Sequence, residues 1–175
     1  MDHDWMARGK EVIEIEIEAL ENVKRLIGPA FASAVELLAS CKGRVAVTGI
    51  GKSGLVGRKM AATFSSTGTP AYFLHPVEGA HGDLGAIREE DAIIAISYSG
   101  KTVELNAVLP AIRSLGARIT PITRGLDSPL ASLSDNGLDL SGPRQACPMN
   151  RAPSSSPPAT PPSVAAHGTA SSEPT

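Results

Sequence analysis

Residues 44–54 read Arg-Val-Ala-Val-Thr-Gly-Ile-Gly-Lys-Ser-Gly. The run 44–48 is short, apolar and rich in β-branched residues, which predicts a buried strand, and the glycines after it predict a tight turn. Residues 53–66 then continue with a pattern typical of a helix. A strand, a glycine-rich turn and a helix in this order are the repeating unit of a parallel α/β sheet.

The same unit recurs along the chain. Residues 92–97, Ala-Ile-Ile-Ala-Ile-Ser, are apolar without alternation, which is typical of a strand covered on both faces. We expect further strands at 71–74, 118–123 and 137–140, and further helices at 29–40, 103–115 and 129–134. The prediction is an α/β fold, a three-layer sandwich in which a five-stranded parallel sheet lies between helices.

The two ends of the chain differ from this core. Residues 11–21 alternate Glu with Ile like a strand, but their continuation towards Gly28-Pro29 has helical spacing, so we favour an N-terminal helical arm over residues 1–30.

The domain itself is expected over residues 31–150. Eight of the 14 prolines follow Gly142, and residues 151–175 are mostly Ser, Pro, Ala and Thr, which predicts a disordered tail with no domain after it.

Composition excludes several classes of protein. Sixteen basic and 18 acidic residues give a net charge of −2, which leaves no basic surplus for nucleic acid or an anionic membrane. No apolar run is long enough to span a bilayer, and the N-terminus lacks the layout of a signal peptide. Cys41 and Cys147 are too few and too far apart for a disulfide framework or a zinc pattern. We expect a cytoplasmic protein.

The glycine-rich turn 49–54 is the first candidate site, because backbone N–H groups at a helix start attract anions. A dinucleotide site needs an acid after the second strand, where His75-Pro76 stands instead. A nucleoside triphosphate loop would place its first Gly at Ala46, inside the strand. A monophosphate or sugar site and a plain tight turn remain as interpretations.

A second loop, Ser97-Tyr98-Ser99-Gly100-Lys101-Thr102, repeats the arrangement after the third strand. One hydroxyl would be a plain helix cap, whereas three hydroxyls with a glycine favour a phosphate ligand. In a doubly wound sheet the loops after the first and third strands flank the position where ligands bind. We therefore expect one crevice lined by Lys52, Ser53, Ser97, Ser99 and Thr102.

Two further features have two interpretations each. Glu104, one turn into the following helix, is either a general base that points into the crevice or a surface carboxylate that stabilises the helix. The loop 75–85 contains two His and two acids. It is either a metal site or a rigid, internally hydrogen-bonded turn.

Several motifs taken together resemble a known family. They are Val47 to Gly54, Gly57 to Thr63, Ser66 to Pro70, His75-Pro76, His81 to Gly85, Ile96 to Gly100 and Ala146-Cys147-Pro148. In this order they resemble the sugar isomerase (SIS) domain of the D-arabinose 5-phosphate isomerases, over residues 10–150. The resemblance implies interconversion of D-ribulose 5-phosphate and D-arabinose 5-phosphate, which belongs to the synthesis of the Kdo sugar of lipopolysaccharide. It also implies a homotetramer, with a sugar phosphate as the small-molecule partner.

The resemblance assigns roles to particular residues. It implies Lys52 and Glu104 as catalytic residues, and Gly68, Thr69 and His81 as substrate contacts, beside Gly51, Ser53, Ser97, Ser99, Gly100 and Thr102 of the two loops. No cofactor is required, and zinc at His75 stays an open alternative. An enediolate reaction needs a base, a donor for the oxyanion and a phosphate site, which Glu104, Lys52 and the hydroxyl loops would supply.

The chain also departs from the family pattern. The family usually has a Glu before the Ala-Cys-Pro motif, where this chain has Gln145, and an amide cannot take up a proton at neutral pH. The CBS domains that commonly follow in the family are not expected here. Two hypotheses therefore remain, an isomerase with impaired turnover and a sugar-phosphate-binding module without catalysis.

Overall fold

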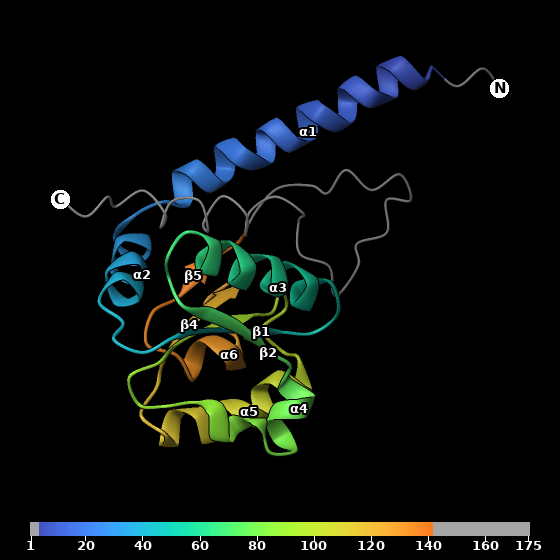
Figure 1. Cartoon of the computed structure of the whole chain (residues 1–175). Helices are drawn as coiled ribbons and strands as arrows, with labels where there is room; N and C mark the ends of the chain where they lie inside the picture. Colours follow the sequence, from blue (N-terminus) through green and yellow to red (C-terminus); the bar gives the residue numbers. More distant parts are fainter. Residues whose placement is uncertain (1–3, 142–175) are drawn as a thin grey trace.

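The computed structural model describes residues 4–141, and every structural statement below concerns these residues. The tail expected over 151–175 lies outside them. Helices and strands alternate along most of the described range (Figure 1). In chain order they are α1 Trp5–Leu26, α2 Pro29–Ala39, β1 Val45–Gly49, α3 Gly51–Ser66, β2 Ala71–Leu74, α4 Pro76–Ala80, the 3₁₀ helix η1 Asp83–Ala86, β3 Ala92–Ile96, α5 Val103–Ser114, β4 Arg118–Thr123, α6 Pro129–Ser132 and β5 Leu138–Asp139.

The five strands form one parallel sheet in the order β2-β1-β3-β4-β5. Strands β1 and β3 are the central pair, and all their residues are buried, because helices cover both faces of the sheet. The expected α/β three-layer fold is confirmed.

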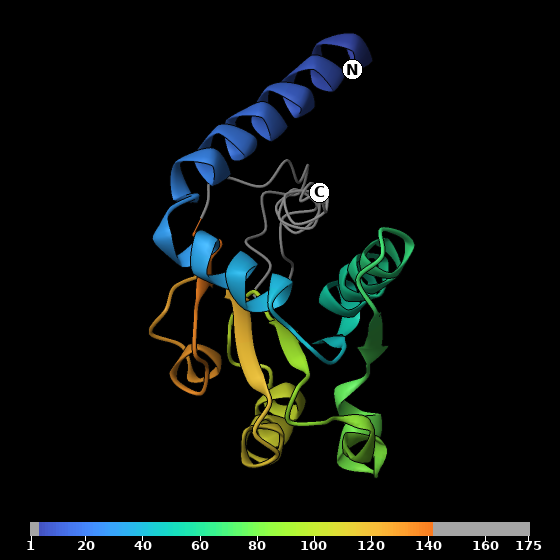
Figure 2. The same cartoon turned by 60° about the vertical axis from the view of Figure 1, so that its left-hand side comes forward.

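Helices cover both faces of the sheet (Figures 1 and 2), and each face has its own apolar core. On one face, Leu37 and Leu38 of α2 and Met60 and Phe64 of α3 pack on alternate residues of β1 and β3. On the other face the main contributions come from α5 and α6, through Leu105, Val108, Leu109, Ile112 and Leu130. Because successive strand residues point to opposite faces, strands that are apolar throughout are buried on both sides.

The N-terminal segment is a helix, not the strand that the Glu–Ile alternation also permitted. It begins earlier than expected, because the Asp4 carboxylate caps it by accepting hydrogen bonds from the N–H groups of Met6 (3.1 Å) and Ala7 (2.9 Å). No helix within residues 4–141 is long and apolar enough to cross a membrane.

The segment expected as a loop at 75–85 contains two short helices, α4 and η1. Proline at the first helical position, Pro76, favours the start of α4, because its fixed φ suits a helix and its missing N–H would be unpaired there in any case. The side chain of Leu84 packs against Gly79 of α4, where a Cβ would lie 3.5 Å from it.

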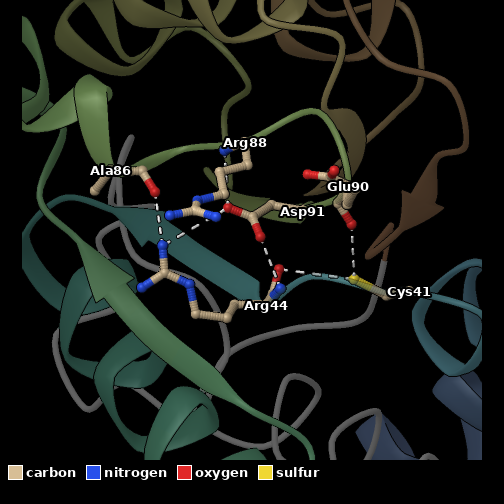
Figure 3. A network of polar contacts seen from close by, with 6 residues as sticks. All are labelled: Cys41, Arg44, Ala86, Arg88, Glu90 and Asp91. Carbon is tan, nitrogen blue, oxygen red and sulfur yellow. Dashed lines mark hydrogen bonds and ion pairs between the residues drawn. The ribbon is translucent and has the colours of Figure 1, made fainter.

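A polar network closes the amino end of the central strands (Figure 3). The buried carboxylate of Asp91 accepts hydrogen bonds from the N–H groups of Arg44 (2.7 Å) and Arg88 (3.0 Å). The Arg44 guanidinium donates to the carbonyl of Ala86 (2.6 Å) and lies over the ring of Tyr72. Burial, and then the charge of Asp91, raise the pKa of Tyr72 above its ordinary value. This network joins the start of β1 to the segment before β3.

Candidate functional site

The strand order places a switch point between β1 and β3. The chain passes from β1 to β2 on one side and reaches β4 and β5 from β3 on the other. Ligands of doubly wound sheets bind at the carboxyl ends of the strands at such a point, because the two crossover helices diverge there. The turns 49–51 and 97–102 follow β1 and β3 directly, so the two predicted loops lie at this position.

The first loop is closely packed, which its glycines permit. A Cβ on Gly49 would lie 2.9 Å from the carbonyl oxygen of Ile96, and one on Gly54 would lie 2.8 Å from the carbonyl oxygen of Gly49. Gly51 has a φ of +59°, a left-handed conformation that favours glycine. The turn therefore brings the end of β1 against the end of β3, and the first turn of α3 against the end of β1.

The second loop is held by its own hydroxyl groups. The Ser97 and Thr102 hydroxyl oxygens lie 2.7 Å apart, and the Ser97 hydroxyl also accepts from the Gly100 N–H (3.1 Å). The Ser99 hydroxyl accepts from the Lys101 N–H (3.3 Å). The loop is thus a defined turn rather than a set of free hydroxyls.

Both helices at the switch point begin without a side-chain cap. The N-cap residue of α3 is Ile50, which has no side-chain acceptor, and the hydroxyl of Thr102 at the start of α5 bonds to Ser97 instead of capping. In the described range Asp4 caps α1 and Ser128 caps α6, whereas α2, α4 and η1 also begin without a side-chain cap, so it is the shared position of α3 and α5 at the switch point that sets them apart. Helices of 16 and 12 residues thus present uncapped first-turn N–H groups at the same edge of the sheet. Such groups, with the positive ends of two helix dipoles, suit an anion.

The candidate catalytic side chains occupy equivalent places on these helices. Lys52 is the second residue of α3 and Glu104 the second residue of α5, and both are exposed. A lysine and a glutamate therefore each lie in the first turn of a helix that begins at the switch point. Ser53 is buried beneath the first loop, 6% exposed.

The histidines lie at the carboxyl end of β2. His75 precedes α4 and His81 follows it, with His81 exposed. The Nδ1 atom of His75 is buried and has no hydrogen-bond partner among residues 4–141, and its ring meets Phe73 edge-on at 6.4 Å. A protein zinc site needs three or four ligands, and no group of three His, Cys, Asp or Glu side chains in the described range could hold a metal ion. Zinc at His75 stays a prediction.

Two expected substrate residues lie elsewhere. Gly68 and Thr69 follow the last turn of α3, just before β2 begins. They therefore lie at the amino edge of the sheet, while Lys52 lies at the carboxyl edge. Within one copy of the chain, the structure does not bring Gly68 and Thr69 to the two loops. Gln145 lies outside the described residues.

Sequence analysis did not single out the residues that hold Gly100 in place. The Gly100 carbonyl accepts from the Asn106 amide (3.1 Å) and from the Leu130 N–H (3.1 Å), while Thr123 and Ser128 pack against its Cα. The sequence could have indicated Thr123, because it is a polar residue at the end of a predicted strand. The carboxyl ends of parallel strands meet at one edge of the sheet, where the two loops also lie.

Comparison with known proteins bears on this site directly. The family model of the SIS domain matches residues 37–164, which is most of the chain. The chain belongs to the SIS domain family. Its curated relatives include arabinose 5-phosphate isomerase KdsD of Pseudomonas aeruginosa, 45% identical over 87% of this chain and 47% of that protein. KdsD of Escherichia coli K12 is 46% identical over 90% of this chain and 48% of that protein. The chain thus spans about half the length of the curated relatives that it matches.

A solved SIS structure carries a ligand. The Escherichia coli CFT073 protein c3406 in complex with arabinose 5-phosphate superposes with a TM-score of 0.84 at 36% identity, over 97% of this chain and 92% of that chain. The agreement extends over nearly the whole of both chains. A relative with this fold therefore holds a sugar phosphate.

Proposed function

We propose that this SIS chain binds a five-carbon sugar phosphate at the switch point and interconverts D-ribulose 5-phosphate and D-arabinose 5-phosphate. The observation that carries the proposal is the pair of uncapped helix N-termini at one edge of the sheet, with Lys52 and Glu104 beside them. The names of the relatives and the complex with arabinose 5-phosphate support the choice of substrate.

The phosphate is the part of the substrate that the two loops suit best. The first-turn N–H groups of α3 and α5 would donate to its oxygens, and the Ser99 hydroxyl would add a further donor. The second loop is already ordered by the Ser97–Thr102 contact, so little conformational entropy of that loop is lost on binding.

The transfer of a proton between the two carbon atoms needs one base and one cation, and the transfer between the two oxygen atoms needs a further group that exchanges protons. In the forward direction Glu104 would remove a proton from C1 of the ketose, and the same proton would be returned at C2. The hydroxyl proton on O1 would move to O2, so that atoms and charges balance. Lys52 would stabilise the enediolate oxygen between these steps, since a cation placed where negative charge develops lowers the barrier.

A second candidate function, sugar-phosphate binding without turnover, is favoured by one residue. Gln145 stands where the family usually has a carboxylate, and it cannot exchange a proton near neutral pH. Binding would persist in such a module, because the N–H groups and hydroxyls proposed to hold the phosphate belong to the two loops. Measured binding of arabinose 5-phosphate with no detectable isomerisation would select this function.

The wider setting is part of the proposal. By family resemblance the protein acts in the cytoplasm as a homo-oligomer, a tetramer in the family. We also propose that the SIS domain extends over residues 31–150, after a helical arm over 1–30.

Substitution of Lys52 tests the site. We expect Lys52→Ala to weaken binding of arabinose 5-phosphate by about 1–3 kcal/mol, the usual range for a charge-assisted hydrogen bond. Isothermal calorimetry measures the affinity, and NMR of D-ribulose 5-phosphate turnover measures the rate. Lys59→Ala is the matched control, because Lys59 is an exposed lysine two turns further along the same helix. Equal affinities of Lys52→Ala and the unchanged protein would show that the phosphate binds elsewhere.

A further inference from the structure

A cavity of about 450 Å³ lies at the amino edge of the sheet, and it is here called the amino-edge cavity. Its wall comes from the turn after α2, from residues 89–91 before β3, and from Arg118 at the start of β4. Sites for small molecules usually have volumes of roughly 300–1,000 Å³. The two loops of the proposed sugar-phosphate site lie at the carboxyl edge, so this cavity is a separate feature of the chain.

The wall of the cavity is held in shape by hydrogen bonds and close packing. The carbonyl of Glu90 accepts from the Gly43 N–H (3.1 Å) and from the Cys41 thiol (3.3 Å). A Cβ on Gly43 would collide with the buried carboxylate of Asp91. Figure 3 shows Cys41, Glu90 and Asp91 in this part of the wall. Because these groups are already in place, a ligand would lose little binding energy to their ordering.

The charged side chains around the cavity have both signs. Lys42 and Arg118 supply two cations, and Glu89 and Glu90 supply two carboxylates. All four are exposed, and none of them forms an ion pair within residues 4–141. A phosphate would be attracted by the two cations and repelled by the two carboxylates. A ligand that carries both an ammonium group and carboxylates can pair with all four side chains.

The strand order sets these charges in a row. The amino ends of β1, β3 and β4 lie side by side, since Ala92 pairs with Val45 on one side and with Arg118 on the other. Lys42 precedes β1 and Arg118 begins β4, so the cations lie on either side of the acidic segment before β3. Neighbouring strands are about 4.8 Å apart, which sets the chain roughly 10 Å apart at the two cations. The row therefore suits a ligand with a carboxylate at each end and an ammonium group between them.

We propose that the amino-edge cavity binds a small amino dicarboxylate, a molecule with two carboxylates and one primary ammonium group, of the size of L-glutamate. Its carboxylates pair with Lys42 and Arg118, where charge-assisted hydrogen bonds are formed. Its ammonium group lies between them and donates to the carboxylates of Glu89 and Glu90. Its apolar stem lies against the buried Leu37 in the wall.

The first test is the affinity of the full chain for L-glutamate. Calorimetry or an NMR titration should find saturable binding in the millimolar range or tighter. Lys42→Ala and Arg118→Ala should each weaken it at least about fivefold, because each removes a charge-assisted hydrogen bond. Lys59→Ala is the control, since Lys59 is an exposed lysine on α3. Circular dichroism confirms that the variants are folded. Absence of saturable binding, or an unchanged affinity in both variants, would overturn the proposal.

The second test isolates the ammonium group. Glutarate has the same two carboxylates and no ammonium group, so it should bind the unchanged chain at least about fivefold more weakly than L-glutamate. Glu89→Gln with Glu90→Gln should weaken binding of L-glutamate and abolish its advantage over glutarate. Equal affinities of the two acids for the unchanged chain would contradict the assigned ligand class.

A competition experiment tests that the site is separate from the switch point. An excess of D-arabinose 5-phosphate should not displace L-glutamate, because the two sites lie at opposite edges of the sheet. Displacement would place L-glutamate at the switch point and refute the amino-edge site. The proposed isomerisation is measured independently with D-ribulose 5-phosphate, so either proposal can fail while the other stands.

Discussion

Gly100 is the residue on which the second loop turns. Its φ of +63° is left-handed, and a Cβ there would collide with the side chain of Ser128 and lie 2.8 Å from the Thr123 hydroxyl. Both the backbone conformation and the space around it therefore demand glycine. Its carbonyl and N–H are also bonded, so a shift at this residue would move the whole turn 97–102.

Gly100→Ala should therefore destabilise the fold by about 2–4 kcal/mol, of which about 1–2 kcal/mol is the cost of a left-handed alanine and the rest comes from the collision. Gly68→Ala is the matched control, because Gly68 has a φ of +94° with open space where its Cβ would lie. Gly68→Ala should destabilise the fold only by the cost of an alanine in the left-handed conformation. Urea unfolding of both variants measures the difference, and equal costs would show that Thr123 and Ser128 yield to the added methyl group.

At the scale of elements, the junction of β1 and β3 depends on Asp91. Its carboxylate satisfies two backbone N–H groups, those of Arg44 and Arg88, that frame the amino ends of the two strands (Figure 3). The Arg44 guanidinium is 3.9 Å away and its side chain is 45% exposed, so the ion pair itself adds little. The buried hydrogen bonds are the main contribution.

Asp91→Ala should lower the free energy of unfolding by about 2–4 kcal/mol, since it removes a buried carboxylate and leaves two partly buried N–H donors unpaired. Glu90→Ala next to it serves as the control, because the Glu90 side chain is exposed and only its backbone carbonyl takes part, as acceptor for the Cys41 thiol and the Gly43 N–H. Thermal or urea unfolding checks both. A loss of similar size in Glu90→Ala would mean that local charge, rather than the paired N–H groups, stabilises this junction.

The elements were predictable where one physical signal dominated. Runs such as 92–96 are apolar on both faces, and a sheet covered by helices on both sides accommodates them. The strands and the arrangement of a sheet between two layers of helices could therefore be predicted from the sequence. The start of α1 was missed, because the Asp4 cap precedes the apolar repeat by several residues. Helices α4 and η1 were missed because they are too short to show a period.

The candidate site was predictable in part for the same reason. Lys52, Ser53, Ser97, Ser99 and Thr102 follow two neighbouring strands, so the parallel topology alone places them at one edge. Some of these hydroxyls bond to each other, as Ser97 and Thr102 do. Such pairs depend on side-chain rotamers, which the sequence pattern does not specify. The position of Gly68 and Thr69 at the far end of α3 follows from the length of that helix, which a motif match does not consider.

For the whole molecule, turnover is expected to depend on Gln145, which lies outside the described residues. Losing one general acid or base typically lowers a rate about 10²–10⁴-fold. We therefore expect isomerisation at least about a hundredfold slower than that of KdsD of Escherichia coli K12, with binding of arabinose 5-phosphate retained.

The substitution Gln145→Glu tests whether a missing carboxylate is the cause. It should raise the isomerisation rate at least about tenfold, because a carboxylate can exchange a proton near neutral pH and an amide cannot. Gln145→Asn, which keeps the amide, is the control, and NMR of the isomerisation of D-ribulose 5-phosphate provides the measurement. A rate in the unchanged chain within tenfold of the relative's would refute this account, and would mean that another group, such as His81, serves as the proton carrier.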